Sequence, residues 1–325
     1  MIFIEKTIMV EDIEMTRTGC GVTTSFDLSL GSGAVLYGKW NGGRYEIVRP
    51  LGEGANGKVY LVSNRGRNYA LKVGADVADL QSEINVLRSI ASRQSRGVEP
   101  FLVHIDDFTH AGRDYNFYVM QYIQGMTMTE YLQREGNDWY SLLGVHLLRQ
   151  LTQLHQEGWV FGDLKLDNVL VSQYGRAHLI DYGGVTAIGK SVRQFTELYD
   201  RGYWSAGSRR ADPAYDLFSL AVLLIQVMED RKLAHLSKSR DRSAEQLLAL
   251  VKESAALEPF QGWFKAALSG SFRGASEAST AWQSQYRSRS EFRQRRKSSS
   301  RWLLRAFTTS ILVLAATAYW YLNVN

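Results

Sequence analysis

The chain has 325 residues, of which 45% are hydrophobic and 22% are charged. This balance is typical of a globular protein with a substantial core, and the length allows one large or two ordinary domains. A single cysteine, Cys20, excludes an internal disulfide and favours a reducing compartment. No internal repeat is visible in the sequence.

The net charge of +5 is concentrated near the C-terminus. Residues 287–305 hold eight basic residues and one acidic residue, which gives +7, and residues 306–325 hold no charge. Subtracting that +7 from the total leaves −2 for the first 286 residues. The basic character therefore belongs to a short tail, and the main body is close to neutral.

Residues 1–44 are expected to form an N-terminal extension, and a hairpin is predicted where it ends. The runs 34–40 and 44–48 are rich in strand-forming residues and are separated by the turn residues Asn41, Gly42 and Gly43.

A glycine-rich motif follows, in which Gly52, Gly54 and Gly57 have the spacing G-x-G-x-x-G. A strand followed by a helix at this point would indicate a dinucleotide site, but here both flanking runs are strand-like. A glycine-rich turn between two strands can lie over nucleotide phosphates, because backbone amides approach closely where no Cβ intervenes. A plain hairpin turn is the alternative.

The next predicted strand, residues 69–73, carries Lys72 among apolar residues. A buried lysine is unfavourable unless its ammonium finds a partner, although a lysine on an edge strand can also reach solvent. A helical stripe of apolar residues follows at positions 77, 80, 84 and 87, and Glu83 beside it is able to turn toward Lys72. With strands at 101–108 and 115–120, this half is predicted to be a five-stranded antiparallel sheet with one helix.

Three polar residues further along suit phosphoryl transfer. Asp163 is followed by Asn168 five residues later and by Asp181 thirteen residues after that. One carboxylate would orient and deprotonate an attacking hydroxyl, while the other two groups would hold magnesium on the phosphates of ATP. Taken alone, an Asp and an Asn at this spacing are a common loop pattern.

Helical patterns surround these residues. Residues 139–158 carry an apolar stripe, and His155 near its end is interpreted as structural. Residues 214–228 are apolar on nearly all faces, which predicts a buried central helix. Asp216 near its start is either a helix cap or a tie to the loop of Asp163.

Residues 306–322 form an uncharged run of about 26 Å as a helix, close to the thickness of a bilayer core. With aromatic residues near both ends, a single-pass transmembrane helix is predicted at 303–322. The preceding arginines would place the body in the cytoplasm and the C-terminus outside the cell membrane. A C-terminal helix docked in a groove is the alternative.

The segment between the body and this predicted helix, residues 271–302, is called the basic segment below. Attraction to anionic lipid, contact with the phosphates of DNA, and a linker with autophosphorylated serines are three interpretations of it. The residues proposed to contact DNA or lipid are Arg287, Arg289, Arg293, Arg295, Arg296, Lys297 and Arg301.

The ordered motifs together resemble a Hanks-type serine/threonine protein kinase over residues 45–270. This resemblance implies an α+β, bilobal protein-kinase fold, with the sheet in an N-terminal lobe and a shortened, mostly helical C-terminal lobe. It implies magnesium-dependent transfer of the ATP γ-phosphate to serine or threonine hydroxyls of protein substrates. It also allows manganese in place of magnesium, autophosphorylation and self-association.

The resemblance assigns roles to individual residues. Asp163 and Lys165 would be catalytic, and Asn168 and Asp181 would hold the metal. Glu83 would brace Lys72, although the spacing between them is short. The residues expected to bind ATP are Gly52, Glu53, Gly54, Ala55, Asn56, Gly57, Val59, Ala70, Lys72, Glu83, Met120, Gln121 and Ile123.

The chain also departs from the family pattern. Where the family usually has His-Arg-Asp, this chain has Phe161-Gly162-Asp163. Gly162 removes the arginine that normally pairs with a phosphorylated activation loop, so control by such a phosphate is not expected. The Ala-Pro-Glu motif is not legible. The hydroxyls that remain candidates for modification are Thr186, Ser191 and Thr196.

Within the family, the chain is similar to a membrane-anchored kinase of spore-forming bacilli that binds DNA through its basic segment. That similarity implies a role in sporulation and activation by DNA. Two other functions stay open. A small-molecule phosphotransferase of the aminoglycoside-kinase type shares the Gly-Asp-Leu and Ile-Asp-x-Gly patterns, and a pseudokinase would tether DNA to the membrane without catalysis.

Overall fold

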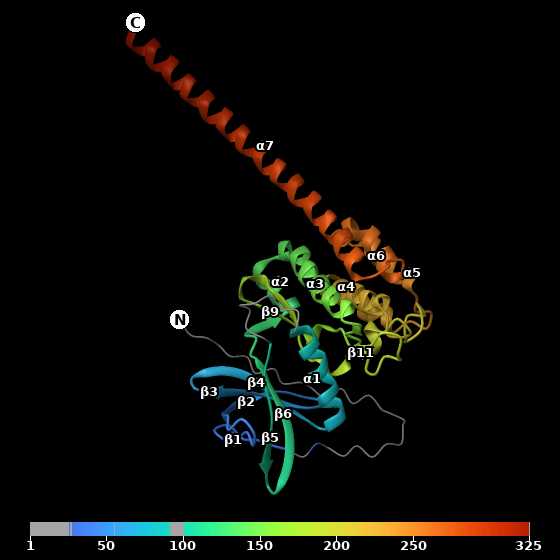
Figure 1. Ribbon diagram of the computed structural model, residues 1–325. Helices are drawn as coiled ribbons and strands as arrows, with labels where there is room; N and C mark the ends of the chain where they lie inside the picture. The colour runs from blue at the N-terminus through green and yellow to red at the C-terminus, as the bar shows by residue number, and fades with distance from the viewer. Residues whose placement is uncertain (1–25, 27, 55, 92–100, 325) are drawn as a thin grey trace.

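The computed structural model describes residues 26, 28–54, 56–91 and 101–324, and the side chains of residues 286–304 and 323–324 lie outside that description. The chain forms two lobes, one built on a β-sheet and one built on helices (Figure 1). It crosses from the N-terminal lobe (N-lobe) to the C-terminal lobe (C-lobe) between the end of one strand at Gln121 and the start of the next at Gly125.

The N-lobe holds a six-stranded antiparallel sheet in the order β1-β2-β3-β4-β6-β5. The predicted count of five strands is wrong, because the expected hairpin at 34–48 joins the sheet, with Val35 opposite Glu46 and Tyr37 opposite Arg44. The strands are β1 Val35–Tyr37, β2 Arg44–Gly54, β3 Gly57–Asn64, β4 Arg67–Gly74, β5 Leu102–His110 and β6 Arg113–Gln121.

The core of the N-lobe is largely aromatic. Phe117 lies edge-on to both Tyr45 and Phe108, with ring centroids 5.7 Å apart in each pair. Leu28 and Leu30 are buried in the same core, although the sequence pattern predicts an N-terminal extension there. The folded N-lobe therefore begins before residue 45.

Helix α1, Val77–Ala91, packs on the N-lobe through Leu80, Ile84 and Leu87, which cluster with Tyr118 of β6. Burial of such side chains contributes about 1.5–3 kcal/mol each. This packing confirms most of the predicted stripe, but Val77 at the first helical position is 62% exposed. The packed face fixes the position of α1, and with it the position of Glu83.

The C-lobe is mostly helical. Its helices are α2 Met128–Glu135, α3 Tyr140–Gln156, α4 Pro213–Ser237, α5 Ala244–Glu253, α6 Gln261–Leu268 and the first part of α7, Ala275–Val324. Its short strands are β7 Gly125–Thr127, β8 Trp159–Val160, β9 Val169–Ser172, β10 Ala177–Leu179 and β11 Thr186–Ala187. Between β11 and α4 lies a long segment, residues 188–212, called the activation segment below.

Helix α4 is the centre of the C-lobe. Every side chain from Tyr215 to Ile225 is buried, which confirms the prediction of a helix that is apolar on nearly all faces. Asp212 caps its start by accepting a hydrogen bond from the backbone N–H of Tyr215, and Pro213 occupies the first turn.

The first turns of α7 belong to the C-lobe core. Trp282 is fully buried and stacks on Phe260, with ring centroids 4.5 Å apart. Gly144 of α3 leaves room for this ring, because a Cβ at that position would lie 2.6 Å from it. The folded lobe therefore continues past residue 270, the end that the sequence predicts.

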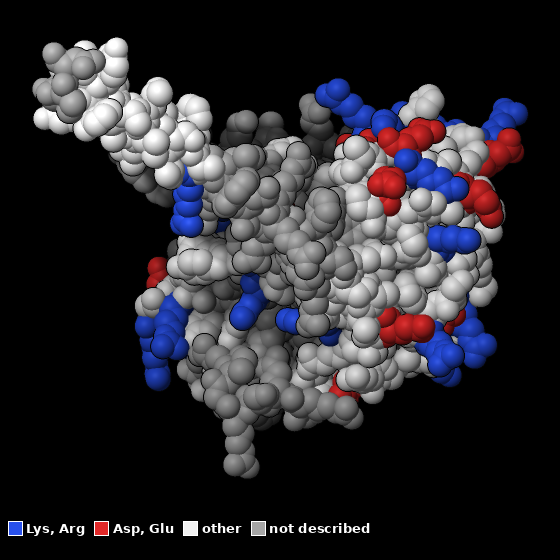
Figure 2. All heavy atoms as spheres, turned by 90° about the horizontal axis from the view of Figure 1, so that it is seen from above, with Lys and Arg blue, Asp and Glu red and all other residues white. Residues whose placement is uncertain are grey.

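Beyond the C-lobe, α7 projects away from the body to Val324, so the basic segment and the predicted transmembrane helix share one continuous helix (Figure 1). Seen from above, basic and acidic side chains are interspersed over the body, and the far end of α7 carries no charge (Figure 2). Within the described part of the chain, no helix has the length and apolarity needed to cross a membrane, so the span predicted at 303–322 is not found there.

Candidate active site

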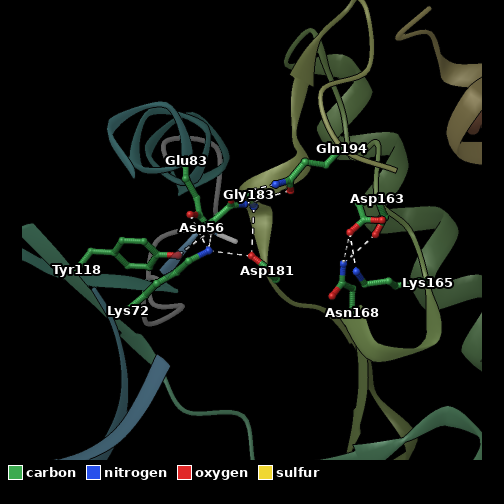
Figure 3. A network of polar contacts seen from close by, with 10 residues as sticks. All are labelled: Asn56, Lys72, Glu83, Tyr118, Asp163, Lys165, Asn168, Asp181, Gly183 and Gln194. Carbon is green, nitrogen blue, oxygen red and sulfur yellow. Dashed lines mark hydrogen bonds and ion pairs between the residues drawn. The ribbon is translucent and has the colours of Figure 1, made fainter. Parts of the chain in front are cut away.

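Lys72 of β4 lies at the centre of a polar network in which Lys72 and Glu83 are buried and Asp181 is half-exposed (Figure 3). Its Nζ lies 2.9 Å from the Glu83 carboxylate and 2.8 Å from Oδ1 of Asp181. The hydroxyl of Tyr118 donates to Glu83 across 2.9 Å. The predicted Lys72–Glu83 contact is therefore present despite the short spacing, because α1 packs close against β4 and β6. Tyr118 has no motif that could have identified it from the sequence.

Lys72 and Asp181 each favour the charged form of the other, whereas burial raises the pKa of Glu83. Burial lowers the pKa of Lys72, but the carboxylates of Glu83 and Asp181 outweigh it, and the pKa of Lys72 is raised overall. Desolvation raises the pKa of Asp181, but the Lys72 ammonium, the Gly183 N–H and Lys165 together lower it by more, so the net shift favours the carboxylate. Lys72 is thus a fixed cation beside a site that could bind phosphate.

Asp181 has an unusual backbone conformation. Its φ of 59° and ψ of 85° lie in the left-handed region, where a residue other than glycine is strained by about 1–3 kcal/mol. The carboxylate is held by Lys72 and by the backbone N–H of Gly183. Strain of this kind concentrates at functional sites.

Asp163 lies in the loop between β8 and β9 and is surrounded by donors (Figure 3). Lys165 Nζ donates to its Oδ2 across 2.8 Å, and Asn168 Nδ2 donates to its backbone carbonyl across 2.8 Å. Thr196 of the activation segment donates to its Oδ1 across 2.9 Å. The predicted residues Asp163, Lys165 and Asn168 are therefore brought together, and Thr196 joins them from a segment with no regular pattern.

Asp216 ties this loop to α4. The fully buried carboxylate accepts from the backbone N–H groups of Phe161, across 2.7 Å, and Gly162, across 2.9 Å. His155 Nε2 lies 2.8 Å from the same carboxylate. Of the two roles left open for Asp216, the tie to the loop is the one observed, and Asp212 provides the helix cap. The interpretation of His155 as structural agrees with this contact.

The glycine motif forms the hairpin between β2 and β3, with Gly54 opposite Gly57. At Gly57 the φ is +129° and a Cβ would lie 1.9 Å from the Val73 carbonyl oxygen, so only glycine fits. No atom lies within 4 Å of where a Cβ would stand at Gly52 or Gly54, which leaves their backbone open to a ligand. Ala55 lies outside the described residues.

An apolar wall lies beside Lys72. Val59 is opposite Lys72 in the β3–β4 register, and Ala70 is opposite Met120 in the β4–β6 register. Residues directly opposite in antiparallel strands share a face, as do residues two apart on one strand. Val59, Ala70 and Met120 therefore share the face of Lys72, as an adenine pocket would need, while Gln121 and Ile123 lie at the crossing between the lobes.

The donor set fits magnesium held with the help of phosphates. No cluster of three or more His, Cys, Asp or Glu suited to hold a metal occurs among the described residues. Asp181 supplies a carboxylate, and Asn168 donates through its nitrogen to Asp163, which leaves its amide oxygen as an acceptor. Magnesium commonly uses one or two carboxylates together with substrate phosphates and water.

The activation segment is fastened to the start of α4. Arg201 forms a bidentate ion pair with Asp212 at 2.7 and 2.8 Å. Such pairs combine charge with fixed geometry. The sequence shows no Ala-Pro-Glu motif, and this local ion pair fastens the end of the activation segment. The predicted DNA or lipid contacts between Arg287 and Arg301 lie on side chains outside the described residues.

Comparison with known proteins agrees with this geometry. Residues 45–280 match the protein kinase domain family. The chain is 38% identical over 257 residues to serine/threonine-protein kinase YabT of Bacillus subtilis, covering 78% of this chain and 75% of that protein. It is 28% identical over 209 residues to serine/threonine-protein kinase PrkC of the same species, covering 61% of this chain and 32% of that protein.

A solved structure shares the fold. The structure of vaccinia related kinase 3 matches with a TM-score of 0.58 and 14% identity, covering 79% of this chain and 91% of that one. At that identity the match shows the fold alone. With the family match and the relation to YabT, the chain belongs to the protein kinases and is a serine/threonine protein kinase of the bacterial Hanks type.

Proposed function

We propose that this kinase transfers the γ-phosphate of magnesium-bound ATP to protein serine or threonine hydroxyls, with Asp163 as the proton acceptor. The observation that carries the proposal is that one site holds two polar networks, one around Lys72 and one around Asp163. Lys72 contacts both Glu83 and Asp181, and Asp163 contacts Lys165 and Thr196. One network suits holding phosphates, and the other suits activating a hydroxyl.

In the transfer, the acceptor oxygen forms a bond to the γ-phosphorus while the bond from that phosphorus to the bridging oxygen breaks and ADP leaves. Asp163 takes the proton of the hydroxyl, and Lys165 neutralises charge on the phosphoryl oxygens. Lys72 binds the α- and β-phosphates, and the backbone of the glycine hairpin covers them. Val59, Ala70 and Met120 form the wall beside adenine.

Asn168 and Asp181 would hold the metal. Magnesium bound there would supply positive charge to the phosphates, and manganese would accept the same oxygen ligands. The residues of the chain orient the reactants around it, because phosphoryl transfer depends on positioning and charge more than on covalent chemistry.

The test is incubation with labelled ATP and magnesium, with a protein acceptor or an aminoglycoside. Wild type is expected to label serine or threonine of the acceptor protein and of itself. Lys72→Ala and Asp163→Ala are expected to lose at least about 100-fold in rate, while the exposed control Lys252→Ala keeps it. Label on the aminoglycoside alone would establish the small-molecule activity instead. Equal labelling in all variants would refute the catalytic assignment and favour a pseudokinase.

We also propose that the basic segment binds the phosphates of DNA. The support is its charge, since it holds all but one of the basic residues that give residues 287–305 a charge of +7, while the rest of the chain is close to neutral. Each phosphate contact contributes about −0.9 to the slope of log affinity against log salt, so a steep dependence is expected. The triple change Arg295→Ala, Arg296→Ala and Lys297→Ala should flatten it.

The matched control neutralises three exposed basic residues of the body, Lys238, Arg240 and Lys252, and should leave the slope unchanged. Binding to anionic vesicles but not to duplex DNA would replace this proposal with attachment to a membrane surface. Binding to DNA that does not depend on salt would contradict contact through phosphates. Adding DNA to the labelling assay tests whether it activates the kinase.

A further inference from the structure

The activation segment is held at three points within four residues. Arg193 lies 3.6 Å from Asp79 of α1, and Thr196 donates to Asp163. Between them, Gln194 bonds to Asn56 of the glycine hairpin. Neighbouring residues of one segment thus contact a helix of the N-lobe, the hairpin over the nucleotide site and the proposed proton acceptor.

The contact between Asn56 and Gln194 is reciprocal. Asn56 Nδ2 donates to Gln194 Oε1 across 3.1 Å, and Gln194 Nε2 donates to Asn56 Oδ1 across 2.8 Å (Figure 3). Both side chains use a donor and an acceptor in one partly buried contact. This contact is called the amide pair below. It joins residues 138 positions apart in the sequence and bridges the two lobes.

The amide pair lies directly against the metal-site backbone. A Cβ built at Gly183 would stand 2.2 Å from Asn56 Nδ2, so the Asn56 side chain occupies the space above Gly183. The backbone carbonyl of Asn56 also accepts from the N–H of Ala75, which fixes the hairpin to the end of β4. Asn56 therefore connects the hairpin, the Asp181–Gly183 turn and the activation segment.

The amide pair involves no phosphate and no charge. Gly162 provides no arginine to bind a phosphorylated activation segment, so the segment needs another means of being held. The amide pair holds Asn56 beside Gln194, and Gln194 is two residues from Thr196, which contacts Asp163. The position of the hairpin is thereby linked to the placement of the proton acceptor.

On the basis of the kinase function proposed above, we propose that Asn56 and Gln194 are positioning residues. Their amide pair holds the glycine hairpin and the activation segment in the arrangement that transfers phosphate, without phosphorylation of the activation segment.

The test uses enzyme treated with phosphatase and shown by intact mass to carry no phosphate. Untreated and treated wild type should have the same kcat within about twofold. Asn56→Ala and Gln194→Ala should each lower kcat/KM for ATP by about tenfold, as expected for two lost hydrogen bonds. The double variant should be no worse than either single variant, because both changes remove the same interaction.

Two further variants separate positioning from general stability. The exchange Asn56→Gln with Gln194→Asn keeps the summed length of the two amide side chains and should restore kcat/KM to within about threefold of wild type. Gln81→Ala is the matched control, because it removes an exposed amide–amide contact with Asn85 on α1, and it should have no effect. All variants should keep the melting temperature of wild type within about 2 °C.

Three results would each overturn the proposal. These are wild-type rates in both single variants, a loss in the double variant equal to the product of the two single losses, and no rescue by the exchange. Loss of activity on phosphatase treatment would overturn its phosphate-independent part. Amide hydrogen exchange without ATP tests the amide pair apart from catalysis. Gln194→Ala should speed exchange across residues 52–60, and Gln81→Ala should not. If wild type has no kinase activity but this difference is seen, the proposed function fails while the contact stands.

Discussion

Gly162→Ala is expected to damage both stability and activity, although it adds only one methyl group. Gly162 is buried and has a φ of +81°, a region that costs a residue with a Cβ about 1–2 kcal/mol. The added Cβ would also stand 2.7 Å from the Gly184 carbonyl oxygen, well inside normal contact. Overpacking of this kind costs about 1–3 kcal/mol. The free energy of unfolding should therefore fall by about 2–5 kcal/mol.

Activity should fall because the neighbouring residue is Asp163. Relief of the contact requires the loop to move, and a displacement of about 1 Å at a reacting group can reduce the rate about 100-fold. Urea denaturation measures the stability of the variant, and the initial rate of acceptor phosphorylation measures its activity.

Gly158→Ala is the matched control. Its φ of +84° is nearly the same, but no atom lies within 4 Å of its missing Cβ, and the residue is exposed. This variant should lose only the backbone contribution, about 1–2 kcal/mol of stability, and keep the wild-type rate. The difference between the two variants isolates the contact with Gly184. Equal stability losses and equal rates in both variants would refute the reasoning.

Two other predictions rest on buried polar contacts. Asp216→Asn puts a donor where the carboxylate accepts from the Phe161 and Gly162 N–H groups. Urea denaturation should therefore show a free energy of unfolding lower by about 2–3 kcal/mol, and the phosphorylation rate should fall. An unchanged unfolding midpoint would contradict this. Burial, with Arg176 and His146 nearby, lowers the pKa of His178 to about 4. The unfolded chain takes up this proton near pH 6.5, so the folded state loses stability as pH falls from about 6.5 to 4. Between pH 6.5 and 4, His178→Gln should lose less stability than wild type. The difference should be below about 3 kcal/mol, because the ring is only half-buried and solvent screens its charge. Equal pH dependence of thermal unfolding in the two proteins would argue against this.

The sequence was sufficient for the parts of the site that rest on local patterns. Lys72 follows from an apolar strand interrupted by one charge, and Glu83 follows from the helical stripe beside it. The structure joins them at 2.9 Å. Alternation in strands and the helical period are local properties, so they predict which residues share a face. The same reasoning found the buried helix around Asp216.

The contacts made by the activation segment could not be predicted in this way. Residues 188–212 have no periodic pattern, and their positions are fixed by distant partners such as Asn56, Asp79 and Asp163. Loops of this kind are placed by the scaffold around them. Gly162 shows the same limit. The sequence indicates that an arginine is missing, and the structure adds that its backbone conformation and the Gly184 carbonyl require glycine.

The C-terminal boundary of the C-lobe could not be predicted from the sequence either. The change to Ser, Arg, Gln and Ala after residue 270 suggests a separate segment. Those residues nevertheless continue a helix whose first turns are anchored by Trp282 against Phe260 and Gly144. One buried tryptophan outweighs the polar composition around it, because a large aromatic side chain dominates local packing energy.

The proposed function depends on Asp163 taking the proton during phosphoryl transfer while Lys72 holds the nucleotide. The most direct measurement is the phosphorylation rate of a protein acceptor by Asp163→Asn at saturating magnesium and ATP, beside its ATP affinity. Asp163→Asn should bind ATP with an affinity within about threefold of wild type and phosphorylate the acceptor at a rate at least about 100-fold lower. A wild-type rate in Asp163→Asn would contradict it.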